Sequence, residues 1–372
     1  MNRLELRSWK DWKIALTVTM ALRVIFSVVA GALSFFLHLN PALVRSNNFT
    51  ENLAVPGSWY YATLGVWERF DTLWYLHIAQ HGYDMPMAVI FYPAYPAAIR
   101  GISWLVSPIV SVLLVSTVAA FFFLWGLIRL APDELSKHGR LILLLLIGVW
   151  PSSFILFGGY AESLTLALIV WAVVFAREGR WWAATLCAAL AGAARPSGVL
   201  VVIPLFVLAW RSRRLQSAIV IFSPAGWLAY WLWVRWSGRN SVVEAYRAYQ
   251  GMTLVAPWTG LWETVRLIVG HADAVLAFKL AVVVLFAVLS LRRNVRLEDK
   301  LFALAVLLQM LMYSGRPLLG AMRYLLLVYP AFIVLASYAE RWKARRLGLV
   351  VAAMGALNLA WLWAFLNWSL VL

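Results

Sequence analysis

Apolar segments long enough to cross a lipid bilayer follow one another along most of the chain, and short basic clusters separate them. A helix needs about 20 consecutive apolar residues for one crossing. Of the 372 residues, 63% are hydrophobic and only 13% are charged, whereas a water-soluble domain carries roughly 25% charged residues. We therefore expect an all-α polytopic membrane protein, in which residues 1–372 form a single transmembrane domain.

Lysine and arginine give the chain a formal charge of +16, and they recur in clusters. Cytoplasmic loops of membrane proteins are enriched in these residues, so the clusters predict cytoplasmic turns and no nucleic-acid surface. Counting the apolar runs between them gives about 11 spans, with the N-terminus inside and the C-terminus outside. The clusters lie at residues 3–13, 129–140, 177–180, 211–214, 292–296 and 341–346.

The same charge pattern predicts which loops are exported. The first apolar run, residues 14–39, is longer than the core of a signal peptide and lacks a small-residue cleavage pattern, so we expect an uncleaved span. Residues 40–87 and 237–272 then form two exported loops. Between 88 and 130 the number of crossings stays open. The simplest arrangement is a membrane-dipping piece over 89–105 and a full span over 109–129.

The first exported loop concentrates polar and aromatic side chains between Trp67 and Pro96. At helical spacing, Phe70, Trp74 and His77 share one face with apolar neighbours, which predicts an interfacial amphipathic helix that Gly82 ends. Asp71 lies beside this face at the bilayer edge. Low dielectric there favours an uncharged carboxyl, so Asp71 is suited to accept a proton. The alternative is a solvated Asp71 with no chemical role.

Four further charged side chains fall at the outer ends of predicted helices: Glu162, Arg195, Arg316 and Arg323. Charged residues inside a membrane bundle are candidates for a functional site. Arg195 precedes Pro196, which breaks the helix, and a guanidinium can bind a lipid phosphate through paired hydrogen bonds. Each residue also has a structural alternative. Glu162 would only favour the N-terminus of its helix, and Arg195 would only extend to the membrane interface. Arg316 or Arg323 would bind ordinary anionic lipid.

We expect no metal and no cofactor. His77 and His81 lie four residues apart and could form half of a metal site, but the sequence offers no evident third ligand nearby. The single cysteine, Cys187, excludes a cysteine-based metal site and a disulfide framework. No glycine-rich phosphate loop is present, so nucleotide-dependent phosphoryl chemistry finds no support.

The order of residues in the first exported loop carries a family resemblance. Phe-Asp-x-x-Trp-Tyr-x-x-Ile-Ala-x-x-Gly-Tyr, followed by Phe-Tyr-Pro-x-Tyr-Pro, resembles the first extracytoplasmic loop of the GT-C glycosyltransferases, specifically the GPI mannosyltransferase II (PIG-V) family and its prokaryotic relatives. Phe70 stands where that family usually has tryptophan. In the family the aspartate of this motif is the proposed catalytic base, so the resemblance implies that role for Asp71.

Three later segments resemble the same family. Residues 158–163, GGYAES, resemble its Tyr-Thr-Glu-Ser segment, and Arg195-Pro196-Ser197-Gly198 resembles its Arg-Ser-Asn-Gly motif, with proline and serine replacing the two middle residues. Arg323-Tyr324 with Pro330 resembles the closing Arg-Tyr segment of GT-C mannosyltransferases. The departure at 196–197 weakens a side-chain role there and leaves the role of Arg195 intact.

The resemblance implies an inverting transferase that moves a sugar, most simply mannose, from a polyprenyl-phosphate donor to a lipid-linked or other membrane-surface acceptor. The reaction would take place on the extracytoplasmic face of a prokaryotic cytoplasmic membrane, or of the ER membrane in a eukaryote. The alternative is a transporter or flippase of a lipid-linked sugar or anionic lipid, for which inverted repeats are expected and not evident. The expected substrate-binding residues are Arg195, Arg323, Glu162, Tyr160, Trp74, Tyr75, His81, Tyr92 and Arg316.

Overall fold

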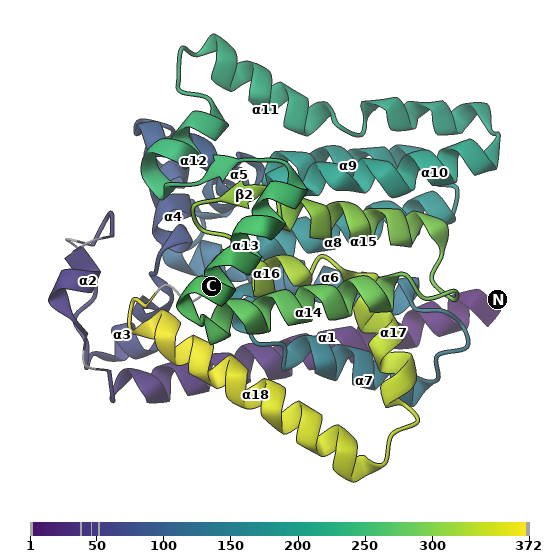
Figure 1. Cartoon of the computed structure of the whole chain (residues 1–372), viewed down its shortest axis with the longest axis horizontal. Helices are drawn as coiled ribbons and strands as arrows, with labels where there is room; N and C mark the ends of the chain where they lie inside the picture. Colours follow the sequence, from purple (N-terminus) through teal and green to yellow (C-terminus); the bar gives the residue numbers. More distant parts are fainter. Residues whose placement is uncertain (1–2, 38, 46, 51–52, 370–372) are drawn as a thin grey trace. The chain divides into compact units, whose positions relative to one another are not determined.

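The computed structural model describes residues 3–37, 39–45, 47–50 and 53–369. The chain is helical: 74% of it is helix, and 15 helices of seven or more residues lie within the described ranges (Figure 1). Among the described residues, four helices are long and apolar enough to cross a membrane: Asp11–Ser34, Pro108–Leu130, Leu215–Trp236 and Ala344–Leu366. Several shorter apolar helices accompany them. These helices support an integral membrane protein, and the count of about 11 spans stays a prediction.

The described chain divides into two compact units. Unit 1 is formed by described residues within Met1–Asp84, Pro93–Trp171 and Ala339–Val371, and unit 2 by Met85–Tyr92 and Ala172–Tyr338. The boundary falls within helix α8 (Glu162–Arg177). The expectation of a single domain over the whole chain stays a prediction.

Unit 1 is organised around α1 (Arg3–Ser34), which packs against α6 (Pro108–Leu130), α3 (Trp59–Thr63), α7 (Lys137–Gly148) and α18 (Ala344–Leu366). The predicted span over 109–129 agrees with α6, which has Pro108 at its first helical position, where a missing N–H costs nothing. The first span ends at Ser34, earlier than the predicted residue 39. A short helix, α2 (Pro41–Arg45), follows.

The segment predicted to be the first exported loop contains η1 (Gly65–Trp67) and α4 (Asp71–His81) of unit 1, and α5 (Ala94–Ile102) follows it. Gly82 ends α4 with a φ of +81°, as predicted. We expected an interfacial helix with a single buried face, and the packing of α4 shows that this expectation is wrong. Thr72, Leu73, Trp74, Tyr75, Ile78 and Ala79 are all buried, because α4 packs against both α5 and α6.

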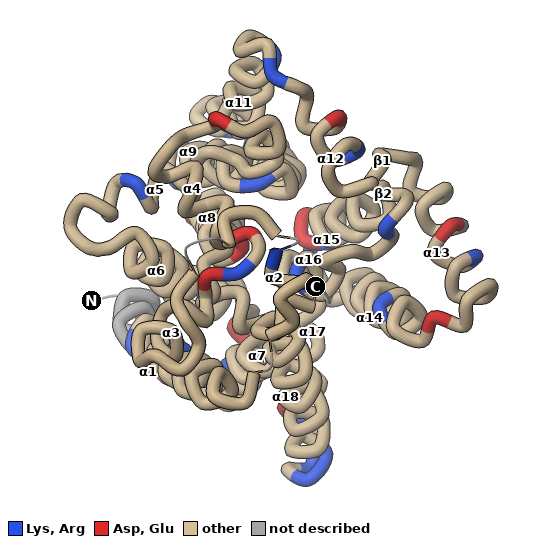
Figure 2. Tube along the Cα trace, turned by 90° about the vertical axis from the view of Figure 1, so that its left-hand side faces the viewer, with Lys and Arg blue, Asp and Glu red and all other residues tan. Residues whose placement is uncertain are grey.

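Unit 2 contains two polar ends joined by apolar helices. Its first helices are α9 (Trp181–Ala194), η4 (Pro196–Val201), α10 (Val202–Ser212), η5 (Leu215–Phe222) and α11 (Ala225–Trp236). Later come α14 (Ala274–Ser290), α15 (Leu297–Met310), α16 (Ala321–Leu325) and α17 (Tyr329–Ala339). Helix α9 packs against α11, and α15 packs against α10 and α14 (Figure 1). The charged residues lie mostly in turns and at helix ends, with long uncharged stretches between them (Figure 2).

The segment predicted to be the second exported loop contains regular secondary structure, which the sequence pattern did not predict. It forms α12 (Val242–Gln250), strand β1 (Thr253–Leu254) and α13 (Pro257–His271). Strand β1 pairs antiparallel with β2 (Tyr313–Ser314), with Leu254 opposite Tyr313. This two-residue ladder adds a small β element to a fold expected to be all-α, and it fixes the loop beside residues 313–314.

Candidate active site and anion-binding residues

Asp71 is the first residue of α4 and is half-buried. The residue before it, Phe70, has a φ of +46°, a region that non-glycine residues seldom adopt. Such backbone persists only where surrounding contacts hold it. The Phe70 ring packs against Phe365 and Trp368, with ring centroids 5.7 and 5.3 Å away. The aromatic end of unit 1 therefore fixes the direction in which α4 starts.

Arg69 holds the same turn from inside the protein. Its side chain is 1% exposed, and it donates to the hydroxyl of Tyr61 at 2.6 Å and to the carbonyls of Gly65 and Glu68 at 3.1 and 3.0 Å. Its guanidinium also lies 4.6 Å from the ring of Trp368. Burial lowers the pKa of Arg69, opposed mainly by Tyr61. The sequence patterns described above did not single out Arg69.

A second carboxyl, Glu68, precedes Asp71 in the same turn. It is half-buried, and the hydroxyl of Tyr60 donates to its Oε1 at 3.4 Å. Burial raises the pKa of Glu68, while the adjacent guanidinium of Arg69 partly offsets the shift. The sequence patterns described above did not single out Glu68.

The GGYAES turn lies directly against the start of α4. The hydroxyl of Thr72, next to Asp71, donates to the carbonyl of Gly158 at 2.8 Å. Gly159 has a φ of +86°, and a Cβ added there would lie 2.6 Å from the Thr72 side chain. A side chain at position 159 would therefore be strained and would collide with α4. This close approach brings together two segments that are far apart in the sequence.

Glu162 opens α8 four residues beyond Gly158 and is 5% exposed. It interacts electrostatically with Tyr95 of α5, whose ring packs edge-on against Tyr75 of α4 at 4.7 Å. Asp71 and Glu162 are thus carried by segments in direct contact, and Tyr75 lies on the same helix as Asp71. A half-buried carboxylate such as Asp71 can take up a proton from a bound hydroxyl group.

Three other residues of unit 1 that we expected to bind substrate differ in burial and in their neighbours. Tyr160 is 1% exposed and packs 6.1 Å from the ring of Phe365, so it supports the turn. Trp74 is buried in α4 and contacts Phe49 at 4.9 Å. His81 is exposed at the opposite end of α4 from Asp71, roughly 15 Å along a helix of this length. A substrate-binding role for His81 stays a prediction, and it would involve a part of the substrate distant from Asp71.

His77 has a partner that accounts for its position. Its Nε2 lies 2.7 Å from Oδ1 of Asp84, and its ring stacks on Phe49 at 4.2 Å. The hydrogen bond from His77 lowers the pKa of Asp84. Within the described ranges, the side chains of His, Cys, Asp and Glu form no group of three placed to hold a metal ion.

In unit 2, Arg195 stands where α9 ends, as the sequence predicted. Helix α9 stops at Ala194, Arg195 is extended with φ −156° and ψ 153°, and Pro196 begins η4. Arg195 is half-buried, its Nη2 donates to the hydroxyl of Tyr324 at 3.2 Å, and its guanidinium lies 5.3 Å from the Tyr324 ring. This geometry leaves a guanidinium and a phenol side by side at the end of a helix.

Tyrosines from three further segments of unit 2 surround Arg195. Tyr246 of α12 and Tyr313 of β2 have ring centroids 6.1 Å apart, and both interact electrostatically with Arg195, Tyr324 and Tyr92. Burial raises the pKa of Tyr246 and of Tyr313, so both hydroxyls stay protonated and can donate. Sequence analysis named only Tyr92 of this group, because no local pattern links segments so far apart.

Arg316 and Arg323, two of the residues expected to bind substrate, lie in different surroundings. Arg323 and Tyr324 both lie over Gly320: a Cβ added there would be 3.2 Å from the Arg323 guanidinium and 3.3 Å from the Tyr324 ring. Arg323 is therefore next to the phenol that Arg195 contacts. Arg316 is exposed before the turn. Substrate binding by Arg316 and by Arg323 stays a prediction.

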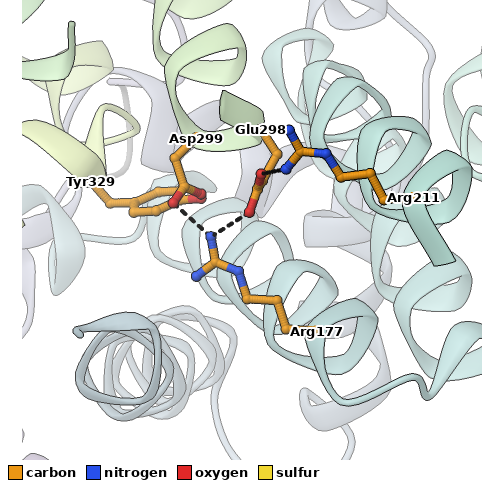
Figure 3. Close-up of polar contacts among 5 residues, drawn as sticks. All are labelled: Arg177, Arg211, Glu298, Asp299 and Tyr329. Carbon is orange, nitrogen blue, oxygen red and sulfur yellow. Dashed lines mark hydrogen bonds and ion pairs between the residues drawn. The ribbon is translucent and has the colours of Figure 1, made fainter. Parts of the chain in front are cut away.

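The other polar end of unit 2 is an ion cluster formed by Arg177, Arg211, Glu298, Asp299 and Tyr329 (Figure 3). Arg177 lies 2.6 Å from Asp299 and 3.4 Å from Glu298, and Arg211 lies 3.1 Å from Glu298. The hydroxyl of Tyr329 donates to Asp299 at 2.6 Å. Both acids lie in the first turn of α15, where their negative charges interact favourably with the helix dipole.

The ion cluster lies at the opposite end of α9 from Arg195. Helix α9 begins shortly after Arg177, and its 14 residues cover about 21 Å before Arg195. In the sequence, Arg177 and Arg211 served only as markers of predicted cytoplasmic turns, whereas both bind carboxylates in the structure. Because every member has a partner of opposite charge or a hydroxyl, we assign the cluster a structural role.

No protein-family model matches the chain. The chain is 31% identical over 175 residues to the GPI alpha-1,6-mannosyltransferase 2 of Cricetulus griseus, 31% identical over 177 residues to that of Rattus norvegicus, and 30% identical over 175 residues to that of Mus musculus. These matches cover 43% to 44% of this chain and 35% of each relative. The chain thus spans little more than a third of the length of these relatives. The distant homology confirms the family resemblance found in the sequence.

Proposed function

We propose that this distant homologue of GPI alpha-1,6-mannosyltransferase 2 is itself a membrane mannosyltransferase. Its donor is a polyprenyl-phosphate mannose, and its acceptor is a hydroxyl group of a lipid-linked or other membrane-surface molecule outside the cytoplasm. The acceptor oxygen attacks the anomeric carbon, the bond from that carbon to the phosphate oxygen breaks, and the configuration inverts. Asp71 takes the acceptor proton. Arg195 and Arg323 stabilise the charge left on the phosphate.

The observation that carries the proposal is the contact between the start of α4 and the GGYAES turn. The hydrogen bond from Thr72 to Gly158 holds the segment of Asp71 against the segment of Glu162. Both segments resemble family motifs, and their contact is what a shared site requires. A direct displacement needs one base and no second carboxylate for a covalent step. We therefore assign proton transfer to Asp71 and an orienting role to Glu162.

The environment of Arg195 supports a lipid phosphate as the leaving group. A guanidinium with a phenol donor beside it matches the acceptor oxygens of a phosphate. The tail of a polyprenyl donor must stay in the bilayer, and the described helices provide apolar surface for it. A nucleotide sugar offers no such tail.

The test uses purified protein in lipid vesicles with polyprenyl-phosphate mannose and a lipid extract of the source membranes. Mass spectrometry should detect lipids that gain one mannose. Asp71→Asn should lower turnover about 100-fold or more, the lower bound for losing a general base. Asp84→Asn is the matched control, because this exposed aspartate belongs to the same loop.

Three results would change the assignment. Unchanged turnover in Asp71→Asn would remove the base from Asp71, and a comparable loss in Glu162→Gln with an active Asp71→Asn would move it to Glu162. Movement of labelled donor across the bilayer without any mannosylated product would favour the flippase alternative.

A further inference from the structure

Helix α13 exposes an apolar stripe along its whole length. Its apolar side chains recur every three or four residues, the spacing of a single helix face. The stripe is formed by Trp258, Leu261, Trp262, Val265 and Val269. Trp258 is 75% exposed, Trp262 69% and Val269 78%. Large apolar side chains gathered in one stripe are unfavourable in water, so we expect a partner that covers them.

The opposite face of α13 is held by the protein. Gly260 and Thr264 are buried there, and a Cβ added at Gly260 would collide with the carbonyl of Leu311. Beside this face, the carboxylate of Glu263 accepts the backbone N–H of Gly315 at 2.9 Å. These contacts fix the rotation of α13 about its own axis. The outward direction of the stripe is therefore set by the fold.

The edge of the stripe carries a charge that suits a phospholipid surface. Arg266 is exposed, follows Val265 and stands one helical turn after Trp262. Tryptophan rings favour the depth of the lipid headgroups, and an arginine at that depth can extend to the phosphates. An apolar face with tryptophan and a cationic edge is the pattern of a helix that lies in a membrane interface.

Helix α13 is too short and too polar to cross the bilayer by itself. Its 15 residues cover about 22 Å, whereas the hydrocarbon core is about 30 Å thick. It carries Glu263, Arg266 and His271, which a lipid-exposed span rarely holds. It also runs obliquely to α14 and α15, two helices against which it packs (Figure 1). A position along the membrane surface agrees with its length, its charges and its direction.

Exposed apolar side chains resume immediately beyond α13. Helix α14, which packs against it, is one of the shorter apolar helices, and its Val275 and Phe278 are exposed. The apolar surface thus continues along the chain from the stripe of α13 into a helix composed for a lipid environment. A lipid cover accounts for both helices.

We infer that α13 lies in the membrane–water interface, with its apolar stripe in the lipid and Arg266 among the headgroup phosphates. The inference goes beyond the proposed function and uses no residue assigned to the reaction. Because α13 is fixed to residues 311–315, this docking also sets the depth of Tyr313 in the membrane. The partner of the stripe is a phospholipid surface.

The experiment measures the depth of three positions in the full chain, reconstituted into vesicles of phosphatidylcholine with a minor share of phosphatidylglycerol. Trp258→Cys, Trp262→Cys and Val269→Cys, each with Cys187→Ser, carry an environment-sensitive fluorophore. Quenching lipids hold a nitroxide near the headgroup end or near the methyl end of the acyl chain. All three labels should lie at one depth, about 5 to 10 Å below the headgroups, and the shallow nitroxide should quench them best. Thr259→Cys, exposed beside the stripe, is the matched control and should be quenched mainly by iodide from the water.

Three results would overturn the inference. A helix that crosses the bilayer would separate the labels at 258 and 269 by roughly 16 Å in depth. Strong iodide quenching of the three stripe labels would leave the stripe in water. Shielding from iodide and from both nitroxides would mean that protein covers it, as in a dimer of this chain. If a labelled variant does not fold, Leu261→Cys or Val265→Cys samples the same stripe. The measurement contains no donor or acceptor, so the presence or absence of mannose transfer does not affect it.

Discussion

Replacing Arg177 by methionine tests how much the ion cluster at the start of α15 stabilises unit 2. The guanidinium of Arg177 contacts both Asp299 and Glu298, whose side chains are 10% and 3% exposed. Methionine keeps most of the apolar stem and removes the charge. Two neighbouring buried carboxylates then lose the cation that they share, although Arg211 and Tyr329 remain.

The magnitude follows from these contacts. Breaking a buried ion pair by removing one partner costs about 3 to 5 kcal/mol. The remaining hydrogen bonds to Arg211 and Tyr329 compensate in part, so we expect about 3 to 4 kcal/mol for Arg177→Met. Asp299→Asn should cost a similar amount. The double variant should also lose only about 3 to 4 kcal/mol, because the second substitution removes the charge that the first left unpaired.

Unfolding of the purified protein in mixed micelles can be followed as the share of dodecyl sulfate rises, with the fluorescence of its 22 tryptophans as the signal. Arg180→Met is the control, because the Arg180 side chain is 62% exposed and its pair with Glu178 is 3.8 Å long. We expect less than about 1 kcal/mol from it. A loss below about 1 kcal/mol for Arg177→Met, or additive losses in the double variant, would refute the structural role of the cluster.

Three further predictions address the site and the topology. Arg195→Ala should weaken binding of polyprenyl-phosphate mannose about 30- to 150-fold and Arg195→Lys should recover part of it, while the exposed Arg293→Ala should bind like wild type; equal affinities in all variants would leave Arg195 as a helix anchor only. Gly159→Ala should lower the free energy of unfolding by about 1 to 3 kcal/mol, because its backbone φ is +86° and the added Cβ would lie within 2.6 Å of two side chains; an unchanged unfolding midpoint would contradict the packing of the turn. A cysteine at Asn47 should react with an impermeant reagent from outside and one at Ser212 should not, and the opposite labelling would place the site on the cytoplasmic face.

Local sequence patterns predicted the elements whose cause is local. Gly82 ends α4 because a glycine tolerates positive φ. Pro196 ends α9 because proline lacks the N–H of the next helical hydrogen bond. The apolar run from Pro108 to Leu130, charged only at Arg129, is a single helix, as its length and hydropathy predict. Each of these features depends on residues within a few turns of one another.

The tertiary structure decided which distant segments meet. Arg177 and Asp299 are separated by 122 residues, and Arg195 and Tyr324 by 129. Nothing in the residues around Arg177 indicates which acid it binds. The sequence therefore marked Arg177 only as a charge in a cytoplasmic turn.

The amphipathic helix expected in the first loop also shows what a local sequence pattern leaves undetermined. Aromatic residues at helical spacing predict an apolar face, but the pattern does not state whether lipid or protein covers it. Packing against α5 and α6 buries α4 on several sides, and Thr72, the residue after Asp71, bonds to the glycine turn before α8. The sequence by itself thus determined a helical membrane protein and the residues able to do chemistry. Only the tertiary contacts decided which of them share a site, because a hydrogen bond or ion pair depends on distance in space and not on separation along the chain.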